Sequence, residues 1–322
     1  MKEIAILTGG DSAEHEISLQ SANVVLNNLN PEKYRGTLIH IKEGKWTAIF
    51  ENKTIEINKK DFSILQNSSK KYFDFVFMAL HGPPAENGTL QPYFDSLNLP
   101  YSSCNSHVSA LTFNKIECNK KLAELGFRCA KSMNLKKEEE IDKDEIINTL
   151  GLPCFIKPNQ AGSSFGISKV KSKSEIDEAI NNALKHDKMV LIEEFIEGIE
   201  VSCGVRILNN KARSFPITEI VTENDFFDYE AKYKGLSKEI TPARISKELT
   251  EQIQKTTEEI YNKMELRGIC RIDYIIMNQL PYIIEINTIP GLSEESILPK
   301  QAKEAGISLS ELFDNCIETT LK

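Results

Sequence analysis

The sequence predicts an α/β protein that opens with a mainly parallel sheet. An apolar run at residues 4–7 is followed by Gly9 and Gly10 and by a helical pattern over residues 18–29, which together form a strand–loop–helix unit. A second apolar run at 73–80 leads into the loop HGPPAENG and then into another helical pattern. Strands that alternate with helices favour an open sheet whose functional loops follow the carboxyl ends of its strands.

Length and composition are those of an ordinary folded protein. The 322 residues correspond to two or three compact units, with 40% hydrophobic and 27% charged residues. The net charge of −8 lacks the basic excess that nucleic-acid binding requires, so we expect no nucleic-acid partner. No apolar run reaches the ~18 residues of a membrane span, and none resembles a signal segment, so we expect a cytoplasmic protein without membrane contact. Seven scattered cysteines without a C-x-x-C pair predict reduced, mostly buried thiols.

The pattern of the chain changes after about residue 98. A helical segment at 114–125 precedes a strand, glycine loop and strand at 151–171, and a helix at 174–186 leads into a strand at 189–195. Further strands are expected at 201–208, 213–221, 270–277 and 281–287, with one long helix at 247–264. We therefore expect an N-terminal domain at 1–103, a central domain at 104–190 and a C-terminal domain at 191–322.

Two of the expected strands form a hairpin with four polar side chains. Because strand side chains alternate, Arg271 and Asp273 share one face, and Glu285 and Asn287 share one face of the partner strand. Carboxylate and amide oxygens within apolar strands call for a cation, and all-oxygen ligation selects Mg²⁺. The alternative is a buried ion pair of Arg271 with one of the two carboxylates.

A glycine-rich segment, NQAGSSFG at 159–166, follows the strand that carries Lys157. It has neither the Gly-Lys-Ser/Thr ending of a P-loop nor G-x-G-x-x-G. Its backbone N–H groups and the hydroxyls of Ser163 and Ser164 would be able to close around phosphate oxygens, with the positive charge of Lys157 nearby. An ordinary loose turn is the alternative.

Three other loops carry polar residues. The segment FFDYEAKY at 226–233 is interpreted as a lid that ends in Lys232 and Tyr233, or else as a surface loop above packed aromatic residues. His81 and Glu86 follow a buried strand, and Glu14 lies in the first such loop. These are ligand-binding positions in an open sheet, although each side chain has a solvated alternative.

Nine segments in order along nearly the whole chain resemble the D-alanine–D-alanine ligases of the ATP-grasp superfamily. The segments are GGDSAEHEIS (9–18), ALHGPPAENGTLQ (79–91), FNK (113–115), CFIKPNQAGSSFGISKV (154–170), LIEEFIEGIEVSCGV (191–205), FFDYEAKY (226–233), RIDY (271–274), IEINTIPGLSEES (284–296) and LP (298–299). The resemblance implies a three-domain ATP-grasp fold with a Rossmann-like preATP-grasp domain at the N-terminus, and ATP between the central and C-terminal domains.

The resemblance also implies roles for individual residues. Positions that match nucleotide contacts are Lys115, Lys157, Ser163, Ser164, Glu193, Glu194, Ile196, Glu200 and Lys232. Asp273, Glu285 and Asn287 match the ligands of two Mg²⁺ ions, for which Mn²⁺ can substitute. Positions that match the amino-acid sites are Glu14 with His81 and Glu86 for the first D-alanine, Ser296 with the Ile297 backbone for the second, and Arg271 with the Gly291 N–H as oxyanion donors. Ser163 and Tyr233 match a hydrogen-bonded pair that closes two loops over the site.

The implied reaction is activation of the first D-alanine by ATP to an acyl phosphate, followed by attack of the second D-alanine's amine. ATP and D-alanine are thus the expected small-molecule partners, and the resemblance suggests a homodimer. Tyr233 argues against the main alternative, a D-alanine–D-lactate ligase, and the intact metal and phosphate residues argue against a catalytically inactive nucleotide-binding relative. One departure lies in the loop H-G-x-x-G-E-D-G of related ligases, where Ala85 and Asn87 replace Gly and Asp. If the loop needs a positive φ there, Ala85 would cost about 1 kcal/mol.

Overall fold

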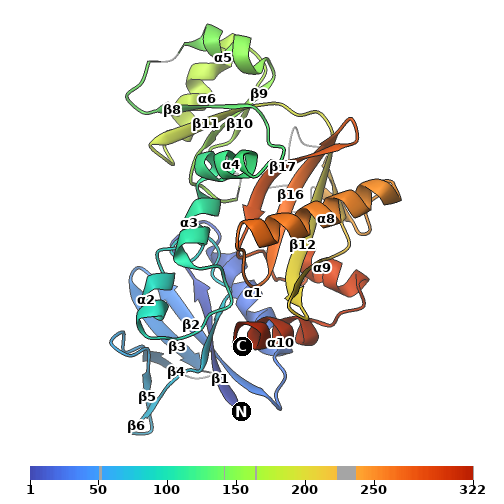
Figure 1. The fold of residues 1–322 in the computed structure, drawn as a ribbon. Helices are drawn as coiled ribbons and strands as arrows, with labels where there is room; N and C mark the ends of the chain where they lie inside the picture. The colour runs from blue at the N-terminus through green and yellow to red at the C-terminus, as the bar shows by residue number, and fades with distance from the viewer. Residues whose placement is uncertain (51–52, 141, 164, 223–236, 322) are drawn as a thin grey trace.

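The structure is a computed structural model that describes residues 1–50, 53–140, 142–163, 165–222 and 237–321. Three main sheets follow one another along the chain, and Figure 1 shows them as a blue region at the bottom, a green and yellow region at the top, and a yellow and orange region beside both. Within the described ranges, none of the helices has both the length and the apolar character that crossing a bilayer requires. The α/β fold class predicted from the sequence is confirmed.

The N-terminal sheet has the strand order β4-β3-β2-β1-β7. Its strands are β1 (Lys2–Gly9), β2 (Tyr34–Lys42), β3 (Lys45–Phe50), β4 (Lys53–Glu56) and β7 (Phe75–Met78). Strand β1 pairs in parallel with β2 and β7, whereas β3 and β4 add an antiparallel edge. The helices α1 (His15–Asn28) and α2 (Gln91–Ser96) belong to this region, as does the separate ribbon of β5 (Ile64–Gln66) and β6 (Ser69–Lys71). The loops after β1 and β7 therefore leave the sheet at the same edge, as predicted.

The middle sheet is antiparallel, with the order β10-β9-β11-β8. Its strands are β8 (Ser132–Lys136), β9 (Cys154–Pro158), β10 (Ser168–Val170) and β11 (Met189–Glu194). The helices α5 (Lys143–Leu150) and α6 (Ile176–Ala183), the latter preceded by the short turn η1 (Lys173–Glu175), bury apolar side chains against it. The helices α3 (Ser106–Phe113) and α4 (Lys115–Glu124) lead from the N-terminal region to this sheet (Figure 1). Strand β11 spans the boundary that we predicted at residue 190.

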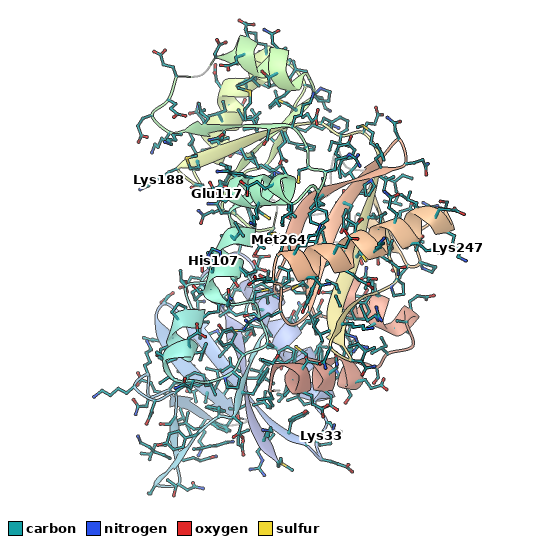
Figure 2. The ribbon with its side chains drawn as sticks, in the orientation of Figure 1. Lys33, His107, Glu117, Lys188, Lys247 and Met264 are labelled. Atoms are coloured by element: carbon teal, nitrogen blue, oxygen red, sulfur yellow. The ribbon has the colours of Figure 1, made fainter. Side chains whose placement is uncertain are left out.

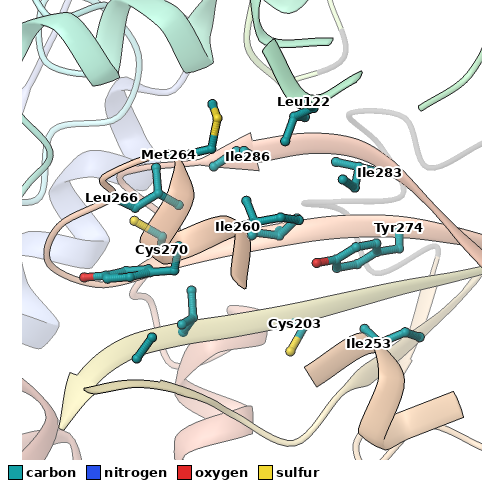
Figure 3. Close-up of a cluster of buried hydrophobic side chains, with 14 of the residues drawn as sticks. Leu122, Cys203, Ile253, Ile260, Met264, Leu266, Cys270, Tyr274, Ile283 and Ile286 are labelled. Atoms are coloured by element: carbon teal, nitrogen blue, oxygen red, sulfur yellow. The ribbon is translucent and has the colours of Figure 1, made fainter. Parts of the chain in front are cut away.

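The third sheet has the order β15-β14-β12-β16-β17, and β13 pairs with β12. Its strands are β12 (Ile199–Leu208), β13 (Lys211–Ser214), β14 (Thr218–Thr222), β15 (Ser237–Ile240), β16 (Cys270–Met277) and β17 (Leu280–Asn287). The long helix α8 (Lys247–Lys263), whose ends are marked by Lys247 and Met264 in Figure 2, covers one face. Its Ile253 and Ile260 lie in the same core as Cys203 and Tyr274 (Figure 3).

The last two helices, α9 (Ile297–Glu304) and α10 (Leu309–Thr320), join the third sheet to the N-terminal region. Phe313 of α10 packs edge-on against Phe77 at 5.4 Å between ring centroids, inside a shared core. At the surface, Lys33, labelled in Figure 2, lies 2.6 Å from the Asp314 carboxylate. The chain's end is thus packed against its beginning.

Several elements differ from the sequence-based expectation. The single strand expected at 213–221 is divided into β13 and β14. Ser214 pairs with Val205 and Thr218 pairs with Ser202, so three residues between β13 and β14 lie opposite two residues of β12. Pro216 lies in this bulge, where its missing N–H costs no ladder hydrogen bond. Helices α3, α5, α9 and α10 were not predicted from the sequence.

The cysteines agree with the prediction. All seven are free, and six of them are buried. Burial raises the pKa of Cys118 to about 12, which fits an inert core residue rather than a reactive thiol.

Candidate functional site

A cavity of about 450 Å³ lies between the middle and third sheets. It is lined by charged side chains that the sequence analysis singled out on separate strands, together with apolar residues such as Phe155 and Ile275. The predicted residues that line it are Lys115, Lys157, Glu193, Glu194, Ile196, Glu200, Asp273 and Glu285. A cavity that combines apolar walls with charged groups is suited to a charged cofactor.

One end of the cavity carries a buried ion pair. Lys157 of β9 and Glu193 of the neighbouring strand β11 are each 7% exposed, and the Lys157 ammonium contacts the Glu193 carboxylate. Asn119 of α4 donates from Nδ2 to Glu193 Oε1 at 2.8 Å. One turn earlier on α4, Lys115 Nζ donates to the Ala161 carbonyl at 2.8 Å, so its ammonium lies beside the glycine-rich loop. Two of the predicted phosphate-binding lysines thus flank this loop.

The predicted hairpin is confirmed as β16 and β17, with Asp273 opposite Glu285. The ion pair that we weighed as an alternative is also present, because Arg271 donates from Nε and Nη2 to the two Asp273 oxygens at 2.9 and 2.8 Å. Asn287 donates to Asp273 Oδ2 at 2.9 Å, and Ser202 of β12 donates to Oδ1 at 2.5 Å. Among the described residues, there is no group of three His, Cys, Asp or Glu side chains suited to a metal ion.

The carboxylates at the cavity are of the type that Mg²⁺ binds. Mg²⁺ is usually held by one or two carboxylates and completes its octahedron with water and substrate phosphates. Asp273 and Glu285 supply two carboxylates that face the cavity, and Asn287 lies two residues beyond Glu285 on the same strand face. This donor set fits Mg²⁺ bound together with a phosphate-containing ligand, provided that the Asp273 carboxylate releases one of the four hydrogen bonds that it accepts.

The N-terminal and glycine-rich loops meet at Glu14. Ser163 Oγ donates to Glu14 Oε1 at 2.6 Å, although the two residues are 149 positions apart. A Cβ at Gly162 would lie 2.7 Å from Glu14 Oε2, so a larger residue there would require the Glu14 side chain to shift. Ser163 itself adopts a φ of +49°, an uncommon backbone conformation of the kind that clusters at functional sites.

The loop after β7 places His81 and Glu86 at the edge of the N-terminal sheet that also carries the Glu14 loop. Glu86 is partly buried and accepts a hydrogen bond from the Gly82 N–H at 3.2 Å. Removal from water and, next, the Glu14 carboxylate raise the pKa of Glu86 to about 8. Burial lowers the pKa of His81, so its imidazole is neutral. A neutral Glu86 avoids placing a second negative charge beside the Glu14 carboxylate.

The Gly-to-Ala departure in this loop does not carry the expected cost. Ala85 is fully buried, but it is absent from the described residues with positive φ. Its carbonyl accepts a hydrogen bond from Gln91 Nε2 at 2.7 Å, and Asn87 Oδ1 accepts one from the Thr89 hydroxyl at 2.9 Å. The loop therefore accommodates both replacements with its own hydrogen bonds.

The expected acceptor residues lie between β17 and α9. Ser296 is the N-cap residue of α9, and its hydroxyl is 2.7 Å from that of Ser293. A Cβ at Gly291 would lie 2.7 Å from Ser296 Oγ, so this turn passes closely over the serine. Ile297 begins the helix, where backbone N–H groups favour an anion. Ser164, Lys232, Tyr233 and the remaining lid segment lie outside the described residues.

The structure adds residues that sequence reasoning missed. Asn119 lies four residues after Lys115, a helical spacing that places both on one face of α4. Ser202 lies directly across the strands from Asp273, and strand alternation would have found it once β12 and β16 were paired. Arg244 and Glu219 also line the cavity, and Arg244 donates from Nε and Nη2 to the two Glu219 carboxylate oxygens at 2.9 and 2.7 Å. Because the two residues lie 25 positions apart, no local sequence pattern indicates this pair.

Comparison with known proteins agrees with this geometry. The family model "D-ala D-ala ligase N-terminus" matches residues 3–104, and "D-ala D-ala ligase C-terminus" matches residues 120–318. The chain is 51% identical over 322 residues to a D-alanine–D-alanine ligase of Flavobacterium johnsoniae, covering 100% of both chains. It is 44% identical over 319 residues to a D-alanine–D-alanine ligase of Phocaeicola vulgatus, covering 98% of both.

The fold of this chain is also similar to those of solved ligase structures. The VanG D-Ala:D-Ser ligase from Enterococcus faecalis has a TM-score of 0.88 at 34% identity, covering 98% of each chain. The D-alanine–D-alanine ligase from Bacillus anthracis complexed with ATP has a TM-score of 0.81 at 30% identity, covering 100% of this chain and 98% of that one.

Proposed function

Because this chain belongs to the D-alanine–D-alanine ligase family, we propose how its own side chains carry out that family's reaction. The protein is an ATP-dependent ligase of the ATP-grasp type that joins two D-alanine molecules for peptidoglycan synthesis. The observation that carries the placement of the substrates is the hydrogen bond from Ser163 to Glu14. It joins the glycine-rich loop of the nucleotide cavity to the N-terminal loop, so ATP phosphates and a D-alanine at Glu14 would be neighbours.

ATP occupies the cavity between the middle and third sheets in this proposal. Lys115 and Lys157 bind phosphate oxygens, which would draw the Lys157 ammonium away from Glu193. Glu193 keeps a hydrogen-bond donor in Asn119 when this happens. The residues assigned to the adenine and ribose end are Glu193, Glu194, Ile196 and Glu200, all of which line the cavity. Ser164 and Lys232 are assigned to the phosphates from the sequence alone.

Asp273, Glu285 and Asn287 would hold Mg²⁺ at the phosphate end. When bound, the metal neutralises charge on the transferred phosphoryl group and orients it. Arg271 and Ser202 fix the orientation of the Asp273 carboxylate through three hydrogen bonds. Supporting residues of this kind tune the affinity of a metal site.

The reaction then proceeds in two steps. The carboxylate of the first D-alanine attacks the γ-phosphorus of ATP, which gives an acyl phosphate and releases ADP. The amine of the second D-alanine attacks the acyl carbon and loses a proton, and the carbon–oxygen bond to phosphate breaks. Glu14 binds the ammonium of the first D-alanine, and Arg271 and the Gly291 N–H donate to the oxyanion that forms. A closed site keeps water from the acyl phosphate.

The second D-alanine binds with its carboxylate at Ser296 and the first N–H groups of α9. The positive end of that helix and the serine hydroxyl suit a carboxylate. The similarity to VanG, a D-Ala:D-Ser ligase, makes the identity of the acceptor the sharpest question about this pocket.

The test is ATP-dependent phosphate release with D-alanine alone, and then with D-serine or D-lactate added in equal amount, with products identified by mass. We expect D-alanyl-D-alanine as the main product in every mixture. A main product that contains D-serine or D-lactate would overturn the acceptor assignment. No ATP-dependent phosphate release with any acceptor would overturn the function itself.

Light scattering on the purified protein tests the proposed homodimer.

A further inference from the structure

The turn at residues 289–292, which carries Gly291, is hydrogen-bonded at both ends to the N-terminal region. Leu292 N–H donates to the hydroxyl of Ser21 on α1 at 3.1 Å, and that hydroxyl lies 2.8 Å from His81 Nε2. The other ring nitrogen, His81 Nδ1, lies 2.9 Å from the Ile289 carbonyl oxygen. Ser21 is 0% and His81 4% exposed, so these contacts are shielded from water.

The chemistry of the partners fixes the direction of these hydrogen bonds. A carbonyl oxygen only accepts, so His81 Nδ1 must carry the proton that bonds to Ile289. In a neutral imidazole Nε2 then has a lone pair, and Ser21 donates its hydroxyl proton to it. Ser21 Oγ in turn accepts from Leu292. The Ser21 hydroxyl thus makes two hydrogen bonds, one as donor and one as acceptor, and each nitrogen of the His81 ring makes one.

We infer that Ser21 and His81 are positioning residues that hold the Ile289–Leu292 turn, and through it the Gly291 N–H, in place for the oxyanion. This inference rests on the proposed function, in which Gly291 is an oxyanion donor. Pro290 has no N–H, so the turn has few hydrogen bonds of its own to fix its shape. The imidazole and the hydroxyl together bridge its two ends.

The arrangement also joins two parts of the protein. The turn follows β17 of the third sheet, whereas Ser21 and His81 belong to α1 and the loop after β7 of the N-terminal region. The hydrogen bond between His81 and Ile289 spans 208 residues, and the one between Ser21 and Leu292 spans 271. The oxyanion donor would therefore reach its working position only when the two regions are packed together. His81 acts in this scheme through the turn rather than through the contact with the first D-alanine that the resemblance implied, because both of its ring nitrogens are engaged by Ser21 and Ile289.

The test compares Ser21→Ala and His81→Asn with wild type by kcat, by KM for ATP and by melting temperature. Removal of one oxyanion donor costs about 10² to 10³ in kcat, so a displaced donor should cost about tenfold or more. We expect KM for ATP to stay within about twofold, because the nucleotide cavity is untouched. The double variant should lose about as much as either single variant, because the two residues act as one unit.

Ser109→Ala is the matched control. Ser109 is also a 0% exposed helical serine with hydrogen bonds to its hydroxyl, but it lies on α3 away from the turn. We expect it to lower the melting temperature by a similar amount and to keep kcat within about twofold of wild type. If Ser21→Ala does not fold, Ser21→Cys, which keeps a weak donor of similar size, takes its place.

A second measurement needs no activity. Nuclear magnetic resonance of protein labelled with ¹⁵N-histidine should show His81 neutral and protonated at Nδ1 at about pH 7. A proton at Nε2, or kcat within twofold of wild type in both turn variants, would overturn the inference while an active wild-type enzyme keeps the proposed function. An inactive wild-type enzyme would instead overturn the proposed function.

Discussion

Replacing Glu86 by glutamine should make the protein more stable at alkaline pH. The pKa of Glu86 is raised from 4.5 to about 8, first by its removal from water and then by the neighbouring Glu14 carboxylate. The folded state therefore favours the neutral acid. This contribution to stability is fully present below about pH 4.5 and is lost as the pH rises through about 8. Glutamine imitates the neutral acid at every pH and can still accept the hydrogen bond from Gly82.

The size of the effect follows from the two pKa values. One pKa unit corresponds to about 1.4 kcal/mol, so the interval from 4.5 to about 8 corresponds to about 5 kcal/mol as an upper limit. Glu86 keeps part of its surface in contact with solvent, which screens its charge. We therefore expect Glu86→Gln to gain roughly 2 to 3 kcal/mol of unfolding free energy over wild type between about pH 5 and about pH 9.

The assay is urea unfolding of the ligand-free protein at several pH values, with Glu32→Gln as the control for an exposed carboxylate. Wild type and Glu86→Gln should have similar stability near pH 5 and diverge progressively as the pH rises to about 8, whereas Glu32→Gln should follow wild type throughout. Parallel profiles for wild type and Glu86→Gln would refute the reasoning, because they would mean that Glu86 has similar pKa values in the folded and unfolded states.

Four further changes test the proposed site. Asp273→Asn should lower kcat by several orders of magnitude at saturating Mg²⁺ and should also lower the melting temperature, because Arg271 loses its buried carboxylate partner; near wild-type turnover would leave Asp273 a structural ion-pair residue. Lys157→Met should weaken ATP binding in calorimetry and cost about 3 to 5 kcal/mol of stability, because the Glu193 carboxylate stays buried without its cation; unchanged values would contradict both roles. Lys232→Ala should raise KM for ATP and lower kcat, and ATP with D-alanine should protect residues 226–235 from limited proteolysis; equal cleavage would argue against a lid. Tyr233→Phe should cost roughly tenfold or less in dipeptide synthesis and raise the ester-to-amide product ratio when D-alanine and D-lactate compete; an unchanged ratio would leave Tyr233 a packing residue.

Features that depend on short-range patterns were available from the sequence. The hairpin of β16 and β17 was predicted from two apolar runs and a turn, and strand alternation was enough to place Asp273 and Glu285 in one polar cluster. The opening strand, loop and helix were likewise visible in the local pattern. Such features are predictable because a period of two or 3.6 residues is set by the backbone itself. The assignment of roles to these residues came from the resemblance of nine ordered motifs.

Only the tertiary structure decided which residues meet across long distances in the chain. The contacts of Lys157 with Glu193 and of Ser163 with Glu14 depend on how sheets and loops pack, and no local period encodes them. The same holds for Ser21, an ordinary helical serine in the sequence, whose hydroxyl meets a turn 271 residues away. Burial and neighbouring charge, which raise the pKa of Glu86, exist only after folding has removed water and brought Glu14 near. The sequence by itself therefore determined many of the strands and helices and which polar residues lie at their ends. Packing determined which of those residues become hydrogen-bond or ion-pair partners, because such pairing depends on distances that only the folded chain defines.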